Sequence, residues 1–204
     1  MTQPERLIVG LGNPGAAYAR TRHNIGFRGV ETLAPPGARW SAKFDAAVCS
    51  AVLAGIPCLL LKPMTMMNLS GQAVVQALRF FRLTPVALIV LHDDLDLVPG
   101  RVKVKRGGGA GGHNGLKSLD AALGPDYERV RMGIGHPGPG RQDAVTDYVL
   151  GPFSGHDEKT WVQPLLEVLP TAFPLLVRGE REAFLRHVRE ALGEDLEPPP
   201  GPRD

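Results

Sequence analysis

The stretch VALIVLHDDLDL, residues 86–97, indicates the fold class of this chain. Its first six residues are all apolar, and acidic residues follow at Asp93 and Asp94. A strand that is apolar at every position has both faces covered, as strands in the middle of a parallel sheet do. Helices must then cover both faces of that sheet, so the stretch predicts a three-layer α/β domain.

The segments on either side of this strand extend the pattern. Before it, residues 68–81 carry apolar residues at helical spacing, and either Asn68 or Ser70 is a candidate N-cap. After it, RVKVKR at 101–106 alternates basic and apolar residues, as a strand with one exposed face does. The apolar face of the helix is formed by Ala73, Val74, Ala77, Leu78 and Phe81.

Strands and helices alternate along the rest of the chain. Further strands are predicted at residues 6–12, 46–55, 56–63 and 129–138. Further helices are predicted at residues 21–34, with Thr21 as a candidate N-cap, at 116–123, and from 161 to 192 with interruptions at Pro164, Pro170 and Pro174. We predict a single domain over residues 1–192, with helices on both faces of a mixed, mostly parallel sheet, and a disordered tail over 193–204.

The composition limits the class of protein. A net charge of +2 is too small to imply nucleic acid by itself, so a nucleic-acid partner must be argued from where the charge is concentrated. The longest apolar runs are of strand length and the first ten residues lack a signal-peptide pattern, so we expect a cytoplasmic protein without a membrane partner. Cys49 and Cys58 lie in or beside apolar segments without motif spacing, which predicts buried thiols rather than a disulfide or metal site.

GLGNPG, residues 10–15, satisfies the dinucleotide-binding pattern G-x-G-x-x-G. Pro14 lies inside the pattern and biases Asn13 toward an extended conformation, so no helix opens within the glycines. The acid that the dinucleotide fold requires is also missing, because Glu31 falls in a helical pattern. We therefore interpret the stretch as a tight strand-to-helix turn, which either is only structural or exposes the Asn13 amide.

GGGAGGHNGLKS, residues 107–118, is similar to a phosphate-binding loop. The Walker pattern fails because Leu116 stands where a glycine should precede Lys117. One interpretation is a mobile lid over 107–115 that carries the amide of Asn114 into a cleft. The other is an N-cap role for Asn114.

His23 follows the first strand, and Asp93 ends the long apolar strand, so both lie where α/β proteins build their sites. An aspartate can accept a hydrogen bond from an imidazole and fix its tautomer, which would make His23 a base. The alternative is a histidine that only packs on its helix. Metal binding by His92, Asp93 and Asp94 is disfavoured, because adjacent strand residues point to opposite faces. Asp94 and Asp96 are expected to be solvated.

Positive charge is concentrated between Arg101 and Lys117, where five basic residues occur without an acid. Lys103 and Lys105 alternate with valines and so lie on one face of their strand, which is the ordinary pattern of an amphipathic edge strand. Beside the glycine-rich stretch they raise the local potential, which favours a phosphate backbone as partner. Arg129 and Arg131 are candidates to extend the patch.

Seven separated segments resemble bacterial peptidyl-tRNA hydrolases in sequence, order and spacing, over about residues 7–155. These are VGLGNPG (9–15), Tyr18, TRHN (21–24), MNLSG (67–71), HDDLDL (92–97), GGHNGL (111–116) and RMGIGHPG (131–138). The family cleaves the ester between a peptide and the 3′ ribose of its tRNA. The resemblance implies an esterase that acts on peptidyl-tRNA. We expect a monomer that needs no metal or cofactor.

The resemblance also implies roles for particular residues. It makes His23 the catalytic base and Asp93 the acid that orients it. It places Asn13 among the substrate-binding amides, and we expect this amide to stabilise the oxyanion. It implies substrate contacts for Tyr18, Asn68 and Asn114, and tRNA contacts for Lys103, Lys105 and Arg131. Two departures from the family pattern are Met66, which replaces a common aromatic in the peptide-side wall, and Asp94, which replaces a glutamate. A catalytically silent RNA-binding relative and a metal-dependent hydrolase are the alternative functions.

Overall fold

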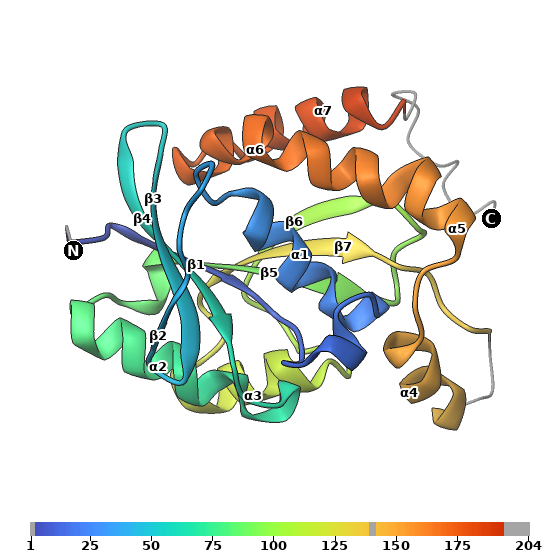
Figure 1. Cartoon of the computed structure of the whole chain (residues 1–204), viewed down its shortest axis with the longest axis horizontal. Helices are drawn as coiled ribbons and strands as arrows, with labels where there is room; N and C mark the ends of the chain where they lie inside the picture. The colour runs from blue at the N-terminus through green and yellow to red at the C-terminus, as the bar shows by residue number, and fades with distance from the viewer. Residues whose placement is uncertain (1–2, 139–141, 194–204) are drawn as a thin grey trace, which may run out of the picture.

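A computed structural model describes residues 3–138 and 142–193 and has seven strands in one sheet within these ranges (Figure 1). The strand order is β2-β3-β4-β1-β5-β7-β6. The central strands β4, β1, β5 and β7 run parallel, and β2, β3 and β6 pair antiparallel to their neighbours. The strands are β1 (Arg6–Gly10), β2 (Ser41–Lys43), β3 (Ala46–Leu53), β4 (Ile56–Pro63), β5 (Leu88–Asp94), β6 (Val102–Arg106) and β7 (Glu128–Gly133).

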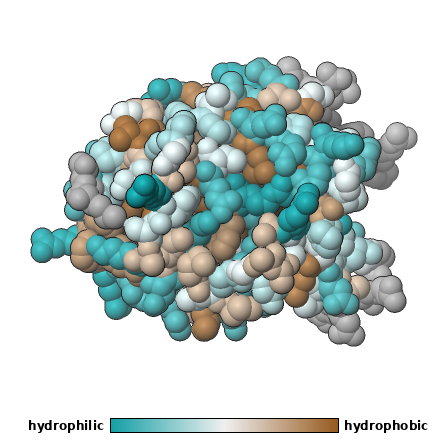
Figure 2. All heavy atoms as spheres, in the orientation of Figure 1, coloured by the Kyte–Doolittle hydropathy of each residue, from teal (hydrophilic) through white to brown (hydrophobic). Residues whose placement is uncertain are grey.

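Helices cover both faces of the sheet, which confirms the three-layer α/β class. One face is covered by α1 (Ile25–Thr32), α6 (Gln163–Val177) and α7 (Arg181–Ala191), the other by α2 (Ser70–Phe81) and α3 (Asn114–Leu123). The remaining helical segments are η1 (Ala16–Tyr18), η2 (Arg22–Asn24), η3 (Met67–Leu69), η4 (Pro85–Ala87), α4 (Gln142–Leu150), α5 (Gly155–Asp157) and the π-helical turn η5 (Glu158–Val162). Hydrophilic residues cover most of the surface in Figure 2, with only small hydrophobic patches between them.

The central position predicted for the apolar strand is confirmed. β5 lies between β1 and β7, and its first four residues are at most 2% exposed. Leu88 and Val90 pack under α2 and α3, whereas Ile89 and Leu91 pack in the core on the opposite face. The apolar face predicted for α2 is buried in full. Both free cysteines are buried, as predicted.

The glycine pattern at residues 10–15 serves close packing between a strand and a helix. A Cβ atom on Gly10 would lie 2.1 Å from the carbonyl oxygen of Gly26 in α1, and one on Gly12 would lie 2.6 Å from the Phe27 ring. α1 therefore contacts the sheet at a distance that only glycine permits. This contact holds the segment before α1, which carries His23, against the ends of β1 and β5.

Replacing Gly10 by alanine is expected to lower the free energy of unfolding by about 1–3 kcal/mol, because the atom in the way is backbone and can move only with α1. Urea denaturation measures this change. Gly155→Ala is the matched control, since a Cβ there meets no atom within 4 Å. Equal urea midpoints for the two variants would contradict the close packing of Gly10 against α1.

The N-caps predicted from the sequence are wrong. Thr21 occupies the N-cap position of η2, but its hydroxyl donates to the carbonyl of Tyr18 instead of capping. Asn68 and Ser70 do not cap α2, since Leu69 is its N-cap residue and the Ser70 hydroxyl donates to a preceding carbonyl. In both places a 3₁₀ turn precedes the α-helix and supplies the backbone hydrogen bonds that a cap would otherwise provide.

The C-terminal helices also differ from the prediction. α6 continues through Pro170 and Pro174, and Pro164 lies in its first turn, directly after the π-helical turn η5. Eight buried apolar residues of α6 outweigh the two backbone hydrogen bonds that the interior prolines remove. α4 was not predicted. The predicted tail lies outside the described residues except for Gly193, and α7 ends two residues before it at Ala191.

The helical run from Gly155 to Val177 is long and apolar enough to cross a membrane, so the prediction that no segment reaches that length does not hold. Of the most apolar 18-residue window in this run, 56% is buried inside the domain. Leu169 and Phe173 on this run are fully buried against the sheet. Such burial is typical of a core helix.

Candidate active site

A cleft of about 1150 Å³ opens beside the carboxyl ends of β1, β5 and β7. Ligand sites of parallel sheets form at this edge, because the loops that follow the strands meet there. Its walls come from segments far apart in the chain, namely η2, η3, the loop before α3, and α4. α1, α2 and α3 all begin at this edge, so the positive ends of three helix dipoles face the cleft region.

His23 and Asp93 meet at this edge. The Nδ1 atom of His23 lies 2.9 Å from Oδ1 of Asp93, and the two residues are 8% and 3% exposed. Burial alone would lower the pKa of His23, but the charge of Asp93 and the hydrogen bond to it raise the pKa above its ordinary value. Since the carboxylate accepts, Nδ1 carries the proton of the neutral ring and Nε2 is left with its lone pair.

His113 is a third member of this cluster, and it was not predicted from the sequence. Its Nε2 lies 3.0 Å from the same oxygen of Asp93, and its Nδ1 accepts from the backbone N–H groups of Gly115 and Leu116. These partners require a ring with Nδ1 unprotonated and Nε2–H donating to Asp93. His113, and not Asn114, is thus the N-cap of α3.

The Asp93 carboxylate is therefore held as an anion by two imidazoles. Burial would raise its pKa, but the charges and hydrogen bonds of His23 and His113 lower the pKa of Asp93 well below its usual range. The sequence signal for the N-cap role of His113 was its position directly before the start of α3. Usual N-cap preferences rank asparagine far above histidine, so that signal pointed to Asn114 instead.

The three side chains also have the spacing of a metal site. Coordination by Nε2 of His113 would require its proton to move to Nδ1, where two backbone N–H groups already donate. The cluster therefore fits a hydrogen-bonded relay better than a metal centre. His92 does not join it either, because its Nδ1 lies 2.7 Å from the backbone oxygen of Asp93, and burial, with the nearby His113, lowers its pKa to about 3.

Asn13 lies in the cleft with a fixed orientation. Its Oδ1 accepts from the backbone N–H of Met67 at 2.8 Å, which leaves its Nδ2 as a donor. The Asn24 side chain holds the backbone of Asn13 through two hydrogen bonds of 2.9 Å, one to its N–H and one to its carbonyl. Asn24 was also missed, although it lies directly after His23 in the motif TRHN.

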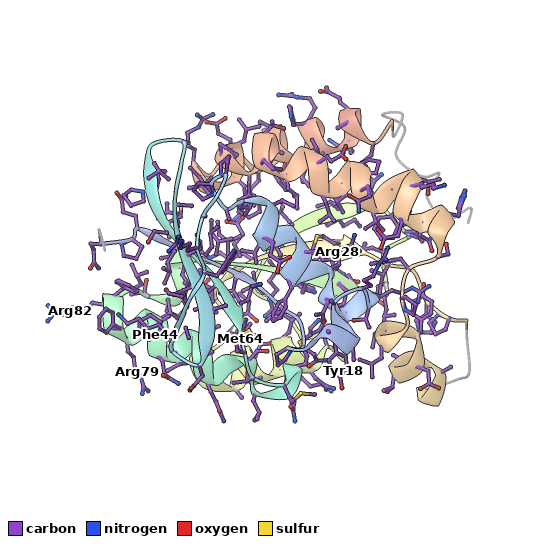
Figure 3. The ribbon with its side chains drawn as sticks, in the orientation of Figure 1. Tyr18, Arg28, Phe44, Met64, Arg79 and Arg82 are labelled. Atoms are coloured by element: carbon purple, nitrogen blue, oxygen red, sulfur yellow. The ribbon has the colours of Figure 1, made fainter. Side chains whose placement is uncertain are left out.

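The other predicted substrate residues divide into two groups. Asn68, Asn114 and Met66 are exposed and line the cleft. Tyr18 lies on η1 near Gly15 and is not among the lining residues (Figure 3). The residues predicted to contact peptide thus mostly surround the cluster, and Tyr18 lies apart from them.

Only two of the three basic residues predicted to contact tRNA line the cleft. Lys105 and Arg131 line the cleft, and Lys103 is exposed on the same face of β6 but outside it. Asp94 is not solvated as expected, because its Oδ2 accepts from Nε of Arg131 at 2.7 Å. Asp96 is exposed, as expected.

Arg129 does not extend the basic surface, contrary to the prediction. It is 2% exposed, and its guanidinium binds Asp120 of α3 at 2.8 Å. A second nitrogen donates to the carbonyl of Gly109 at 2.9 Å. Buried cations are normally paired in this way, and here the pair ties the glycine-rich loop to β7 and α3.

Both the sequence and the fold are similar to those of known peptidyl-tRNA hydrolases. The family model described as peptidyl-tRNA hydrolase matches residues 7–194. The peptidyl-tRNA hydrolase of Agrobacterium fabrum is 48% identical over 194 residues, which cover 94% of this chain and 80% of the relative. That of Parvibaculum lavamentivorans is 47% identical over 95% of both chains. A crystal structure of the peptidyl-tRNA hydrolase from Acinetobacter baumannii gives a TM-score of 0.83 at 39% identity, over 92% of this chain and 95% of that one.

Proposed function

The chain belongs to the peptidyl-tRNA hydrolase family, and from that premise we propose how its cleft cleaves the ester that joins a peptide to tRNA. It is a hydrolase, and its substrate is peptidyl-tRNA. The observation that carries the proposed mechanism is the position of one Asp93 oxygen between His23 and His113, in the same cleft as Asn13.

His23 is the general base. With Nδ1–H bound to Asp93, its unprotonated Nε2 takes a proton from water, and that water attacks the ester carbonyl. Asp93 stabilises the imidazolium that forms, since an anion beside the ring favours its charged state. The proton then passes to the 3′ oxygen of the leaving ribose. His113 acts through Asp93, because its Nε2–H holds the same carboxylate oxygen that accepts from His23.

Asn13 supplies the donor for the oxyanion. Its Nδ2 is free to donate because Oδ1 is bound to Met67, and Asn24 keeps the backbone of Asn13 from shifting. A donor fixed before the reaction stabilises developing charge without reorganisation. The helix N-termini at the same edge add to this positive environment.

The peptide and the RNA occupy different sides of the cleft. Asn68 and Asn114 bind peptide amides and carbonyls, and Met66 packs against peptide side chains. Tyr18 lies outside the lining of the cleft and meets only a peptide that extends beyond it. An unblocked aminoacyl-tRNA lacks the amide that these groups would pair with, which explains how the enzyme would spare it. Lys103, Lys105 and Arg131 bind the RNA backbone, and the Asp94 carboxylate keeps Arg131 in place.

The enzyme acts as a monomer in the cytoplasm. The proposed base, its acid and the oxyanion donor all come from one chain, so no second copy is needed to complete the cleft. Peptidyl-tRNA arises where translation takes place, which supports a cytoplasmic location.

The test measures release of N-acetylated amino acid from tRNA, with unblocked aminoacyl-tRNA as the control substrate and a chelator in a parallel reaction. We expect hydrolysis of the blocked substrate alone, with equal rates in the presence of chelator. Loss of activity with the chelator would indicate a metal-dependent hydrolase instead. Binding of tRNA without any release would indicate a catalytically silent RNA-binding protein.

A further inference from the structure

A basic and aromatic surface lies at the end of α2 that points away from the cleft. It consists of Lys43, Phe44, Arg79, Phe80 and Arg82, which we call the α2 patch. Figure 3 shows Phe44, Arg79 and Arg82 grouped around this end of the helix. Phe80 is 59% exposed, although phenylalanine is among the residues most often buried.

The side chains of the α2 patch contact one another. The Lys43 ammonium lies 3.8 Å from the centre of the Phe80 ring, and the Phe44 ring lies 5.2 Å from Phe80. Arg79 and Arg82 flank Phe80 and are exposed. None of the three cations forms an ion pair with a residue that the structure describes. Asp45 borders the patch, with its carboxylate accepting from Gln76.

The backbone conformation of the patch is costly for these residue types. Phe44 has φ 60° and Arg82, which ends α2, has φ 53°. Glycine would adopt either conformation at lower cost, and a bulky side chain with positive φ is uncommon. The Phe44 ring packs against the core beside the buried Phe81, which offsets this cost at residue 44. Arg82 is exposed, so packing does not explain an arginine there, and such an outlier points to a role for the side chain.

The α2 patch lies on the same face of the domain as the residues proposed to bind RNA. Val102 and Val104 of β6 pack in the core beneath α7, so Lys103 and Lys105 lie on the opposite face, which α2 and α3 cover. α2 has 12 residues and so extends about 18 Å from the cleft. The patch is therefore too far away to contact the ester in the cleft.

We propose that the α2 patch is a second RNA contact, which binds the sugar–phosphate backbone of the tRNA body away from its 3′ end. The inference rests on the proposed function, because the substrate carries a long polyanion beyond the cleft. Three unpaired cations complement phosphates, and an exposed aromatic ring packs on a ribose or an unpaired base. The contact raises affinity for the whole tRNA and leaves the chemical step unchanged.

The test compares two triple variants with equal loss of charge. The first is Lys43→Ala, Arg79→Ala and Arg82→Gly. The control is Arg39→Ala, Lys159→Ala and Arg186→Ala, all exposed and outside the patch. Each is assayed on N-acetyl-aminoacyl-tRNA and on the same ester attached to a short 3′-terminal oligonucleotide.

For the patch variant we expect KM on the whole tRNA to rise at least about fivefold, with kcat unchanged. The slope of log KM against log salt falls by about 2 to 3, the value for three lost phosphate contacts. Kinetics on the short substrate stay as in the unmodified enzyme. Equal kinetics for the patch and control variants, or an equal loss on both substrates, would overturn the proposal and leave a protein partner as the occupant.

Arg82→Gly alone separates binding from folding. Glycine relieves the positive φ, so the unfolding temperature should stay the same or rise while KM for whole tRNA increases. An unchanged KM in this variant, with no change in the salt slope, counts against the contact. Failure of the proposed function looks different, since the unmodified enzyme would then hydrolyse neither substrate. Binding of deacylated tRNA by the two triple variants would still decide the inference in that case.

Discussion

Replacing His23 by alanine is expected to lower kcat by about 10²- to 10⁴-fold, the contribution that a general base typically makes. KM should change little, because the proposed peptide and RNA contacts come from other residues. The protein should still fold, since Asp93 keeps its hydrogen bond to His113 and so remains compensated in the interior. Single-turnover release of N-acetylated amino acid from tRNA measures the effect on the chemical step.

His156→Ala is the matched control for this variant. His156 is exposed on α5 and its side chain is outside the cleft, so its removal tests the loss of an imidazole that has no proposed role. Thermal unfolding of both variants shows whether any loss of activity comes from misfolding. An activity of His23→Ala within tenfold of the unmodified enzyme would rule out His23 as the base.

Periodicity predicts the parts of the fold that depend on burial alone. β5 is predicted to be a central strand because every position from Leu88 to Leu91 is apolar. α2 is predicted to be a helix because its apolar residues repeat about every 3.6 residues. Both predictions are confirmed. Pro170 and Pro174 were misjudged because the cost of a proline is local, whereas the burial that outweighs it comes from the sheet against which α6 packs.

The site was harder to predict because its partners come from different strands and loops. The meeting of His23 and Asp93 follows from strand ends that converge at one edge, a rule that applies to any parallel sheet. The pairing of Asp94 with Arg131 depends on the register between β5 and β7, which a single sequence does not show. His113 was missed because its cap depends on ring geometry, which a residue preference cannot express.

The glycine-rich stretches illustrate the same limit. Gly10 and Gly12 match a ligand-binding pattern, yet the neighbours of their missing Cβ atoms are Gly26 and Phe27. A pattern of glycines indicates that another group lies close to the backbone. Only the structure shows whether that group is a ligand or a helix. The interpretation as a tight strand-to-helix turn, made from the position of Pro14, agrees with these contacts, and Asn13 within the turn lines the cleft.

Replacing Asp93 by asparagine is expected to lower kcat/KM at least about 100-fold and to move its pH dependence. His23 must be neutral to act as a base, so the rate rises with pH through its pKa, which in the unmodified enzyme is raised above its ordinary value by Asp93. Asparagine removes the charge that raises this pKa, and burial then lowers it. The acid limb of the pH profile therefore shifts to lower pH while the plateau falls.

The fall in the plateau and the shift of the acid limb, taken together, distinguish loss of the Asp93 charge from loss of the position of the His23 ring. Both histidines contact the same oxygen of Asp93, so the carbonyl oxygen of an asparagine can still accept from both. Asp147→Asn, on the exposed side of α4, makes the same chemical change without a proposed role and should match the unmodified enzyme. A fall in the plateau without a shift of the limb would mean that Asp93 only positions the ring, and an acid limb that moves to higher pH would contradict the assignment of His23 as the base that Asp93 tunes.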